Sequence, residues 1–163
     1  MAPATANESA ILANLLELYA YDFSEFHDVE LGADGRFGYD KLPLYWTEPD
    51  RHPFLFRYRG KLAGFALVTK GPDMEDGERV WDMAEFFVLR RYRRRGTGAE
   101  ATRQILSRLP GRWKIRVMES NKAGREFWAR AIEIALGEAI APVRVEMAGR
   151  DWHVFSFEVQ PAQ

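Results

Sequence analysis

One segment in the middle of the chain limits the possible folds more than any other. Residues 80–89 form an apolar run rich in aromatic and β-branched side chains, which is typical of a strand. Residues 90–98 contain five arginines together with Gly96 and Gly98, and residues 99–109 carry apolar side chains four positions apart. That spacing is typical of an amphipathic helix. The segment therefore predicts a strand that turns through glycines directly into a helix.

Such a turn is suited to bind a phosphate group. Glycine lets an anion approach the backbone closely, and the first N–H groups of a helix have no helical partner. The helix dipole and the arginines add positive potential at the same place. The sequence has neither a P-loop pattern nor the GxGxxG pattern of dinucleotide-binding folds, so the ligand class stays open at this point.

Basic charge is concentrated around this turn. Residues 88–130 hold 13 Lys and Arg against three acids, although the whole chain has 23 Lys and Arg against 24 acids. The clearest acidic part is residues 17–50, with nine acids and two basic residues. A multiply charged phosphate ligand would offset the arginines. A nucleic-acid-binding module is the alternative, but the acidic remainder would repel a long polyanion, so we expect no nucleic-acid partner.

Composition removes several other classes of function. There is no cysteine, which excludes disulfides, thiolate metal sites and a cysteine nucleophile, and three scattered histidines do not suggest a metal site. No apolar run approaches the roughly 18 residues that span a membrane. The first residues, MAPATANES, lack the basic-then-apolar order of a signal peptide. We therefore expect a cytoplasmic protein that binds neither a metal nor a membrane.

The remaining periodicity predicts one mixed α/β domain over residues 1–163, since no repeat or linker divides the chain. In order, the patterns predict a helix at 8–19, a hairpin of strands 53–58 and 62–69, strand 80–89, helix 99–109, strand 113–118, helix 120–135, and strands 142–147 and 152–159. Residues 1–6 have room for only a short additional strand.

The turn also carries a family resemblance. Arg93, Gly96 and Gly98 match the acetyl-CoA signature of the GNAT superfamily of N-acetyltransferases. That signature is [Q/R]-x-x-G-x-[G/A], where x is any residue. Val88 stands five residues before Arg93, as in the family, and the strand 61–68 and the helix after Asn121 also resemble family segments. The resemblance covers about residues 53–158.

The resemblance implies the fold and the cofactor site. We expect a GNAT fold, which is an α/β architecture whose central, mostly antiparallel sheet is splayed at the acetyl-CoA cleft and flanked by helices. The acceptor-side helices would occupy about residues 8–50 and the CoA-binding core about residues 53–158. By resemblance, the residues that bind acetyl-CoA are Phe86, Phe87, Val88, Arg93, Arg94, Arg95, Gly96, Thr97, Gly98, Ala99 and Asn121. Asn121 is equally suited to cap the following helix.

Two acids in the central strand are candidates for the catalytic base. An alkylammonium acceptor must lose a proton before it attacks the thioester, and an acid within an apolar strand is costly to bury without a role or a partner. These acids are Glu85 and Asp82. Strand alternation places them on opposite faces unless a bulge intervenes, so we expect only one in the cleft. We favour Glu85; the alternative is a structural partner for an arginine.

One position departs from the family pattern. The tyrosine that usually protonates the leaving thiolate is replaced by Trp128, which has no acidic proton. Tyr19, Tyr21 or Tyr45 are possible substitutes, and nothing in the sequence selects one. Phe127 and Trp128 are predicted to be core aromatics. The departure keeps open a catalytically silent protein that binds acyl-CoA as a sensor.

The acceptor side is predicted from residues at the end of the first helix. Tyr19, Tyr21, Asp22 and Glu25 fall where the family binds its acceptor, and aromatic rings with carboxylates favour a cationic amine. The alternative is a helix end whose rings pack on the sheet.

We expect an N-acetyltransferase that moves the acetyl group of acetyl-CoA to a primary amine, of a small molecule or a peptide, by direct attack. Whether it forms a homodimer is left open.

Overall fold

The computed structural model describes residues 1–73 and 75–161. Its elements are β1 (Ala2–Pro3), η1 (Ala6–Glu8), α1 (Ser9–Phe23), η2 (Leu42–Trp46), β2 (Arg51–Tyr58), β3 (Lys61–Pro72), β4 (Arg79–Val88), η3 (Arg90–Tyr92), α2 (Thr97–Arg108), β5 (Gly111–Met118), α3 (Lys122–Leu136), β6 (Val143–Met147) and β7 (Arg150–Val159), where η marks a 3-10 helix.

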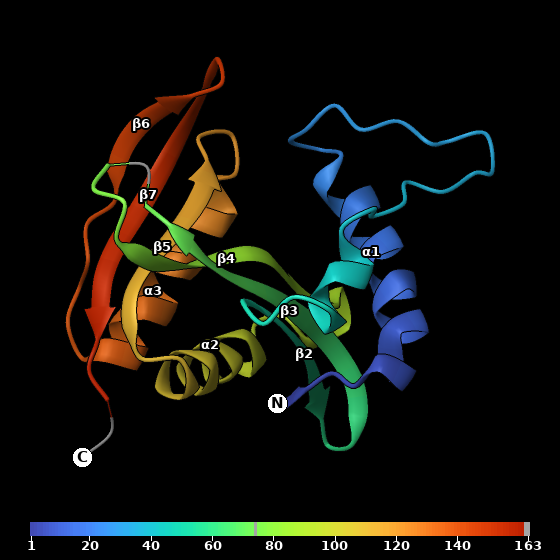
Figure 1. Ribbon diagram of the computed structural model, residues 1–163, viewed down its shortest axis with the longest axis horizontal. Coiled ribbons are helices and arrows are strands. Elements are labelled where there is room, and N and C mark those ends of the chain that lie inside the picture. Colours follow the sequence, from blue (N-terminus) through green and yellow to red (C-terminus); the bar gives the residue numbers. More distant parts are fainter. Residues whose placement is uncertain (74, 162–163) are drawn as a thin grey trace.

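The strands form one sheet in the order β1-β2-β3-β4-β5-β7-β6 (Figure 1). Every neighbouring pair is antiparallel except β4 with β5, which is parallel. The predicted hairpin is confirmed: Tyr58 pairs with Lys61 around Arg59 and Gly60, whose φ angles of 50° and 79° are those of a tight two-residue turn. The mixed, mostly antiparallel sheet agrees with the predicted fold class.

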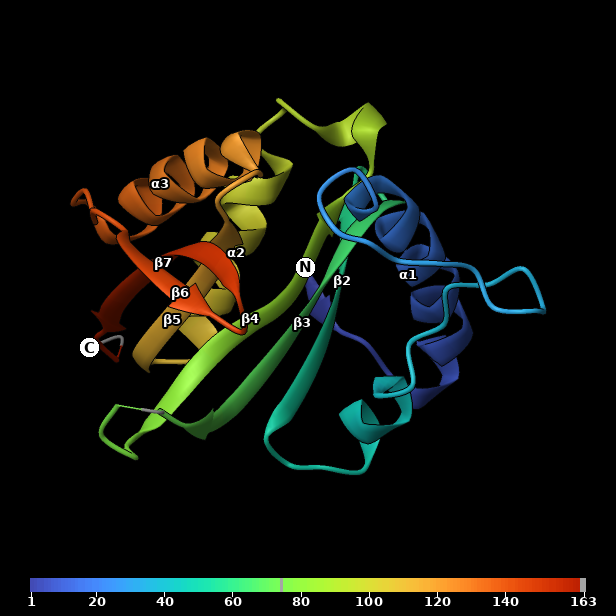
Figure 2. The same cartoon turned by 90° about the horizontal axis from the view of Figure 1, so that it is seen from above.

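Helices cover both faces of the sheet. Figure 2 shows α1 on one side and α2 with α3 on the other. Because successive strand residues point to opposite faces, β3 supplies both cores: Phe65 and Leu67 pack with α1, and Ala66 and Val68 pack with α2 and α3. Because β4 pairs with β3, the side chains near the middle of β4 also point into one or the other of these two layers.

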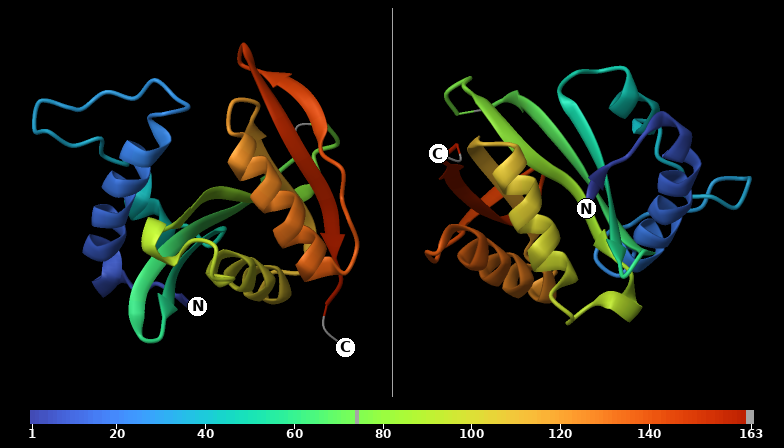
Figure 3. Two further views of the ribbon diagram at one scale, coloured as in Figure 1. Left: turned by 180° about the vertical axis from the view of Figure 1, so that it is seen from behind. Right: turned by 90° about the horizontal axis from the view of Figure 1, so that it is seen from below.

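The segment after the first helix differs most from the prediction. The helix continues to Phe23, four residues past the predicted end, because Phe23 stacks on Tyr19 with ring centroids 5.3 Å apart. The chain then runs irregularly until η2, and this loop extends beyond the sheet (Figure 3). The short first strand is present, pairing Ala2 with Leu55. Among the residues that the structure describes, no helix is long and apolar enough to cross a membrane.

Candidate active site

The sheet opens between β4 and β5. Their residues pair only at Trp81 with Trp113 and at Asp82 with Lys114. Within the described ranges, no residue of β4 after Asp82 pairs with β5, whereas β5 stays paired with β7 as far as Met118. The second half of β4 therefore has an edge that no strand covers.

The backbone orientation at this edge follows from the pairing with β3. The N–H of Leu89 donates to the carbonyl of Ala63 at 2.8 Å. Alternate residues of an antiparallel strand direct both polar groups to the same neighbour. The N–H and C=O groups of Phe86 and Val88 therefore point away from β3, toward the uncovered edge. The side chain of Phe87 lies in the α1-side core, and that of Phe86 packs against α3.

The turn from β4 into α2 has the conformation expected of an anion site. Arg94 and Gly96 have positive φ angles of 57° and 76°, and Gly96 precedes the first residue of α2, Thr97. Glu100 is the first residue whose N–H donates back along the helix, to the carbonyl of Gly96 at 2.9 Å. The N–H groups from Thr97 to Ala99 are consequently without helical partners.

Gly98 has a packing role in addition to the phosphate contact that the sequence predicts for it. A Cβ atom at this position would lie 2.8 Å from a ring carbon of Phe127 and 3.5 Å from the Val88 side chain. Gly98 is buried where α2 meets α3. Any larger residue there would separate α2 from α3 and would also fill the space next to the turn between β4 and α2. A substitution of Gly98 therefore cannot test ligand binding separately from helix packing.

Two of the clustered arginines bind a carboxylate of α1. Asp22 accepts hydrogen bonds from Arg90 Nη2 and Arg93 Nη2, each at 2.5 Å, and Arg93 Nε also donates to the carbonyl of Val88 at 2.8 Å. These two guanidinium groups, with burial opposing them, hold the pKa of the Asp22 carboxyl below its usual value. The predicted acceptor residue Asp22 thus bridges the end of α1 to residues 90–98, the predicted phosphate turn.

Glu85 lies on the α1 side of β4, partly buried between tyrosines. Its Oε1 accepts a hydrogen bond of 3.0 Å from the Tyr39 hydroxyl, and the hydroxyl of Tyr19 faces the same carboxylate. Burial raises the pKa of the Glu85 carboxyl, the two hydroxyls and Arg116 oppose that change, and the charge of Asp82 adds to it. A carboxylate with a raised pKa is better matched to proton transfer near neutral pH.

A bulge brings both predicted acids to the same face. Leu67 pairs with Glu85 and Val68 with Met83, so Ala84 is an extra residue in β4. Asp82 then pairs with Thr69, which shares a face with Leu67. The expectation that only one of the two acids faces this side is therefore wrong, because the bulge that it allowed for is present.

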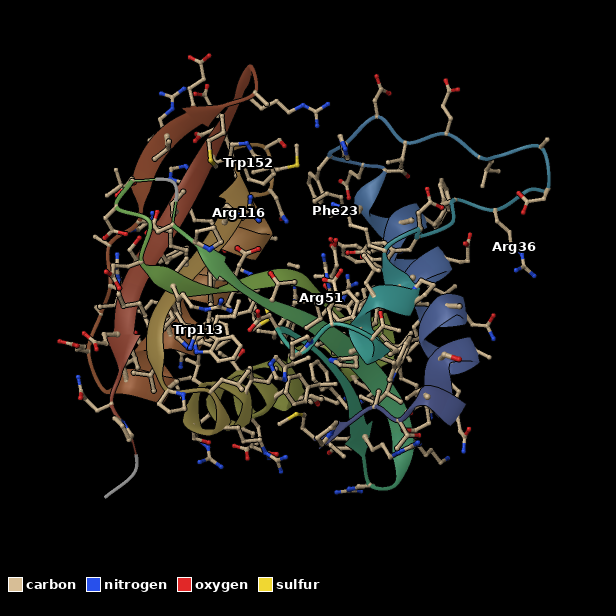
Figure 4. All side chains as sticks on the ribbon, viewed as in Figure 1. Phe23, Arg36, Arg51, Trp113, Arg116 and Trp152 are labelled. Carbon is tan, nitrogen blue, oxygen red and sulfur yellow. The ribbon has the colours of Figure 1, made fainter. Side chains whose placement is uncertain are left out.

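The arginine partner belongs to Asp82. Arg116 Nε and Nη2 donate to its two carboxylate oxygens at 3.1 and 2.7 Å, a paired geometry that fixes both side chains. Arg116 belongs to β5 and Trp152 to the neighbouring β7 (Figure 4), and because Trp152 pairs with Met118, two residues after Arg116, both side chains lie on the same face of the sheet. Asp82 is thus held as half of an ion pair, whereas Glu85 is held by hydroxyl groups.

A cavity of about 670 Å³ lies where α1, β5 and the turn between β6 and β7 approach one another. Arg150 Nη1 contacts the His27 ring across it. Its wall contains more acids than bases, and the residues that line it are Ser24, Glu25, Phe26, His27, Asp28, Met118, Glu119, Ser120, Arg150 and Asp151. The cavity adjoins the uncovered end of β5, and two of its acids, Glu119 and Asp151, form ion pairs with Arg144.

The predicted acceptor residues are not gathered in one place. Glu25 lines the cavity, whereas Tyr19 packs edge-on against Phe65 and Phe87 in the α1-side core. Tyr21 is 70% exposed on the outer surface of α1. Of the four, only Glu25 reaches the cavity and only Tyr19 reaches Glu85.

Two residues after β5 have clear structural roles. Asn121 Oδ1 accepts a hydrogen bond of 2.8 Å from the N–H of Gly124 and so caps α3. Trp128 is 7% exposed and packs edge-on against Phe86 and Phe127, which confirms the predicted core aromatic. The Trp128 ring is thus fixed within the core on the far side of the sheet from Glu85.

The sequence did not point to Tyr39 or to Arg116. Tyr39 stands in an irregular, glycine-rich loop, and Arg116 is one of many basic residues in its segment. The alternation of Lys114 and Arg116 with apolar residues of β5 was a signal that two basic side chains share the face of Asp82. Within residues 1–73 and 75–161, no group of three or more acids and histidines is arranged to hold a metal ion.

Comparison with known proteins agrees with this geometry. The sequence model of the acetyltransferase (GNAT) family matches residues 12–132. No curated protein matches the sequence. Among solved structures, an acetyltransferase from Thermus thermophilus superposes with a TM-score of 0.68 at 16% identity, over 97% of this chain and 95% of that chain.

Arabidopsis thaliana NAA60 is similar in two states. Its complex with a bisubstrate analogue superposes with a TM-score of 0.64 at 14% identity, over 99% of this chain and 98% of that chain. Its complex with acetyl-CoA gives 0.61 at 12% identity, over 96% of both chains. At these identities, the structural likeness establishes the fold.

Proposed function

The chain belongs to the GNAT family of acetyltransferases, and on that premise we propose that it moves the acetyl group of acetyl-CoA to the primary amine of a cationic acceptor. The observation that carries this proposal is the position of Glu85, which lies in the half of β4 whose edge toward β5 no strand covers. The proposed domain is the whole chain, with acceptor contacts from residues 8–50 and CoA contacts from residues 53–158.

The residues fit acetyl-CoA at two points. The outward-pointing N–H groups of Phe86 and Val88 and the carbonyl of Phe86 suit an extended amide chain, whereas the carbonyl of Val88 already accepts from Arg93. The N–H groups at the start of α2 suit a pyrophosphate. When bound, acetyl-CoA supplies the activated thioester. Phe87, Arg93, Arg94, Arg95, Gly96, Thr97, Gly98 and Ala99 complete the proposed site, and Asn121 would border it while capping α3.

The chain's own chemistry is proton removal. The Glu85 carboxylate takes a proton from the acceptor ammonium, directly or through one water, which leaves a nucleophilic amine. Asp82 assists as a second negative charge on the same face, held by Arg116. Glu25 contributes negative charge to the 670 Å³ cavity, where we place the entry of the cationic acceptor, and Tyr19 borders Glu85 from α1.

The departure at Trp128 supports a second candidate, a protein that binds acyl-CoA without turnover. Trp128 has no acidic proton, and its ring packs in the core rather than beside Glu85. Turnover does not require that proton, because a thiol with a pKa of about 8.5 leaves tolerably as thiolate. Measured acetyl transfer separates the two candidates.

The first experiment is thermal unfolding with CoA and acetyl-CoA, followed by a thiol-release screen over a panel of amines. Ligand at 100 times its Kd should stabilise the protein by about 2.7 kcal/mol. Arg94→Glu should weaken that shift, whereas Arg108→Glu, the same charge change at the far end of α2, should not. Binding with thiol release supports the enzyme, binding without release on any amine supports the sensor, and absence of a shift rejects both.

A further inference from the structure

The contact between Tyr39 and Glu85 joins two parts of the chain that no regular element connects. The donor stands in the irregular segment between α1 and η2, and the acceptor lies 46 residues later in β4. The hydrogen bond of 3.0 Å spans from the loop to the sheet, and the Tyr39 ring packs against the α1-side core. The hydroxyl is therefore held in place by more than its own hydrogen bond.

The backbone before Tyr39 is fixed by a carboxylate of α1. Glu17 Oε2 accepts the N–H of Phe37 at 2.8 Å, and Glu17 Oε1 accepts the N–H of Gly38 at 2.9 Å. Both oxygens of one side chain thus bind the two residues that immediately precede Tyr39. Gly38 has a φ of 71°, so the chain turns there through a conformation that favours glycine.

The backbone after Tyr39 is fixed as well. The carbonyl of Tyr39 accepts the N–H of Leu42 at 3.0 Å, which begins the turn into η2. Leu42 is buried in the α1-side core. Tyr39 is consequently anchored on both sides, by Glu17 upstream and by Leu42 downstream, within an otherwise exposed loop.

The Tyr39 hydroxyl is well suited to act as a donor. Burial and the charge of Glu85 both raise the pKa of the Tyr39 hydroxyl, so it keeps its proton over the whole working range of pH. A donated hydrogen bond favours the ionised carboxylate and opposes the effect of burial. The groups that face Glu85 from the surrounding elements are Tyr19, Tyr39, Tyr45, Asp82 and Arg116.

We propose that Tyr39 is a positioning residue for Glu85, whose carboxylate it orients and whose ionised form it favours, and that Glu17 positions Tyr39 by fixing the loop that carries it. This inference rests on the proposed function, in which Glu85 is the base. The loop between α1 and η2 then has two roles. It borders the acceptor side, and it orients the carboxylate that receives the proton.

The test compares Tyr39→Phe and Glu17→Gln with the unmodified protein. Tyr39→Phe keeps the ring and removes the donor, so the acid limb of the pH–rate profile should move up by about one pH unit. Glu17→Gln keeps one carbonyl acceptor for the two N–H groups and should give a smaller shift in the same direction. Tyr58→Phe and Glu30→Gln, matched changes away from this contact, should leave the limb unmoved.

A second readout does not depend on catalysis. The titration of the Glu85 carboxyl, followed by carbon-13 NMR and assigned with Glu85→Gln, should move upward in Tyr39→Phe and in Glu17→Gln. An unchanged Glu85 titration in Tyr39→Phe overturns the role of Tyr39 even where acetyl transfer persists. An unchanged titration in Glu17→Gln, with only reduced stability, overturns the role of Glu17. A shifted titration in a protein that transfers no acetyl group supports the contact and rejects the proposed function instead.

Discussion

Asp82 and Glu85 lie on the same face of β4, although three positions along a regular strand would place them on opposite faces. The extra residue Ala84 in β4 causes this arrangement. Their charges interact: the negative charge of Asp82 adds to the effect of burial in raising the pKa of the Glu85 carboxyl. The bulge is thus what allows one acid to influence the other.

Asp82→Asn is therefore expected to move the acid limb of the pH–rate profile downward. The substitution removes a negative charge beside Glu85 and leaves Arg116 positive, and both changes favour the ionised carboxylate. The direction is opposite to that expected for Tyr39→Phe. The profile of kcat/KM against pH measures it, and Asp34→Asn, in the exposed loop, serves as control. An upward shift would contradict the arrangement.

Glu85→Gln should reduce kcat by about 10²- to 10⁴-fold at neutral pH, because the amide cannot accept the ammonium proton. The affinity for CoA should stay the same, since the phosphate turn is untouched. Steady-state kinetics and calorimetric titration with CoA measure the two effects. The result that removes Glu85 as base is an acid limb that persists unchanged in the variant.

The same substitution should affect stability in a pH-dependent way. Because the pKa of Glu85 is raised in the folded protein, the folded state favours its protonated form. The stability that this protonation supplies is present at low pH and is lost as the pH rises through the folded-state pKa. Glu85→Gln should thus match the unmodified protein in acid and exceed it at neutral pH. Urea unfolding at pH 4 and pH 7.5 provides the comparison.

Gly64→Ala should destabilise the protein by about 1–3 kcal/mol. An added Cβ would lie 2.0 Å from the carbonyl oxygen of Phe87, a backbone atom that can move only with β4. The matched control is Gly71→Ala in the same strand, where nothing lies within 4 Å of the added atom. Equal unfolding free energies for the two variants would show that β3 and β4 are not this closely apposed.

Asp22→Asn should tighten CoA binding about threefold, because it removes a negative charge that holds Arg90 and Arg93 away from phosphate. The salt dependence of binding should become steeper at the same time. Calorimetry at two salt concentrations tests both statements. Weaker binding would mean that Asp22 orients these arginines for the ligand instead of competing with it.

Local patterns predicted the fold well. The apolar run of β4, the glycine turn that leads into α2 and the turn at Gly60 each specify their structure through neighbouring residues, and the structure has all three. The end of α1 was missed because Tyr19 and Phe23 stabilise each other by stacking, without a regular apolar period. The bulge at Ala84 was missed because no glycine or proline marks it.

The site was predictable only where its parts are close in sequence. Glu85 stood out as an acid in an apolar strand, and the phosphate turn follows it directly. Tyr39 and Glu17 reach Glu85 through folded contacts across tens of residues, and no local pattern encodes such contacts. Asp22, predicted to contact the acceptor, binds two arginines 68 and 71 residues away, and no local pattern encodes these contacts either.

Because β4 and β5 pair at only two positions, the four strands from β1 to β4 and the three strands β5, β7 and β6 are joined within the one sheet at a single corner. On the β4 side, the backbone groups of Phe86 and the N–H of Val88 face this opening, while the carbonyl of Val88 is bound by Arg93. A ligand that bonds to these groups would add hydrogen bonds along the edge of β4. Ligand binding between β4 and β5 and resistance to unfolding are then linked through the same backbone groups. The ligand-bound protein should therefore resist unfolding more than the free protein.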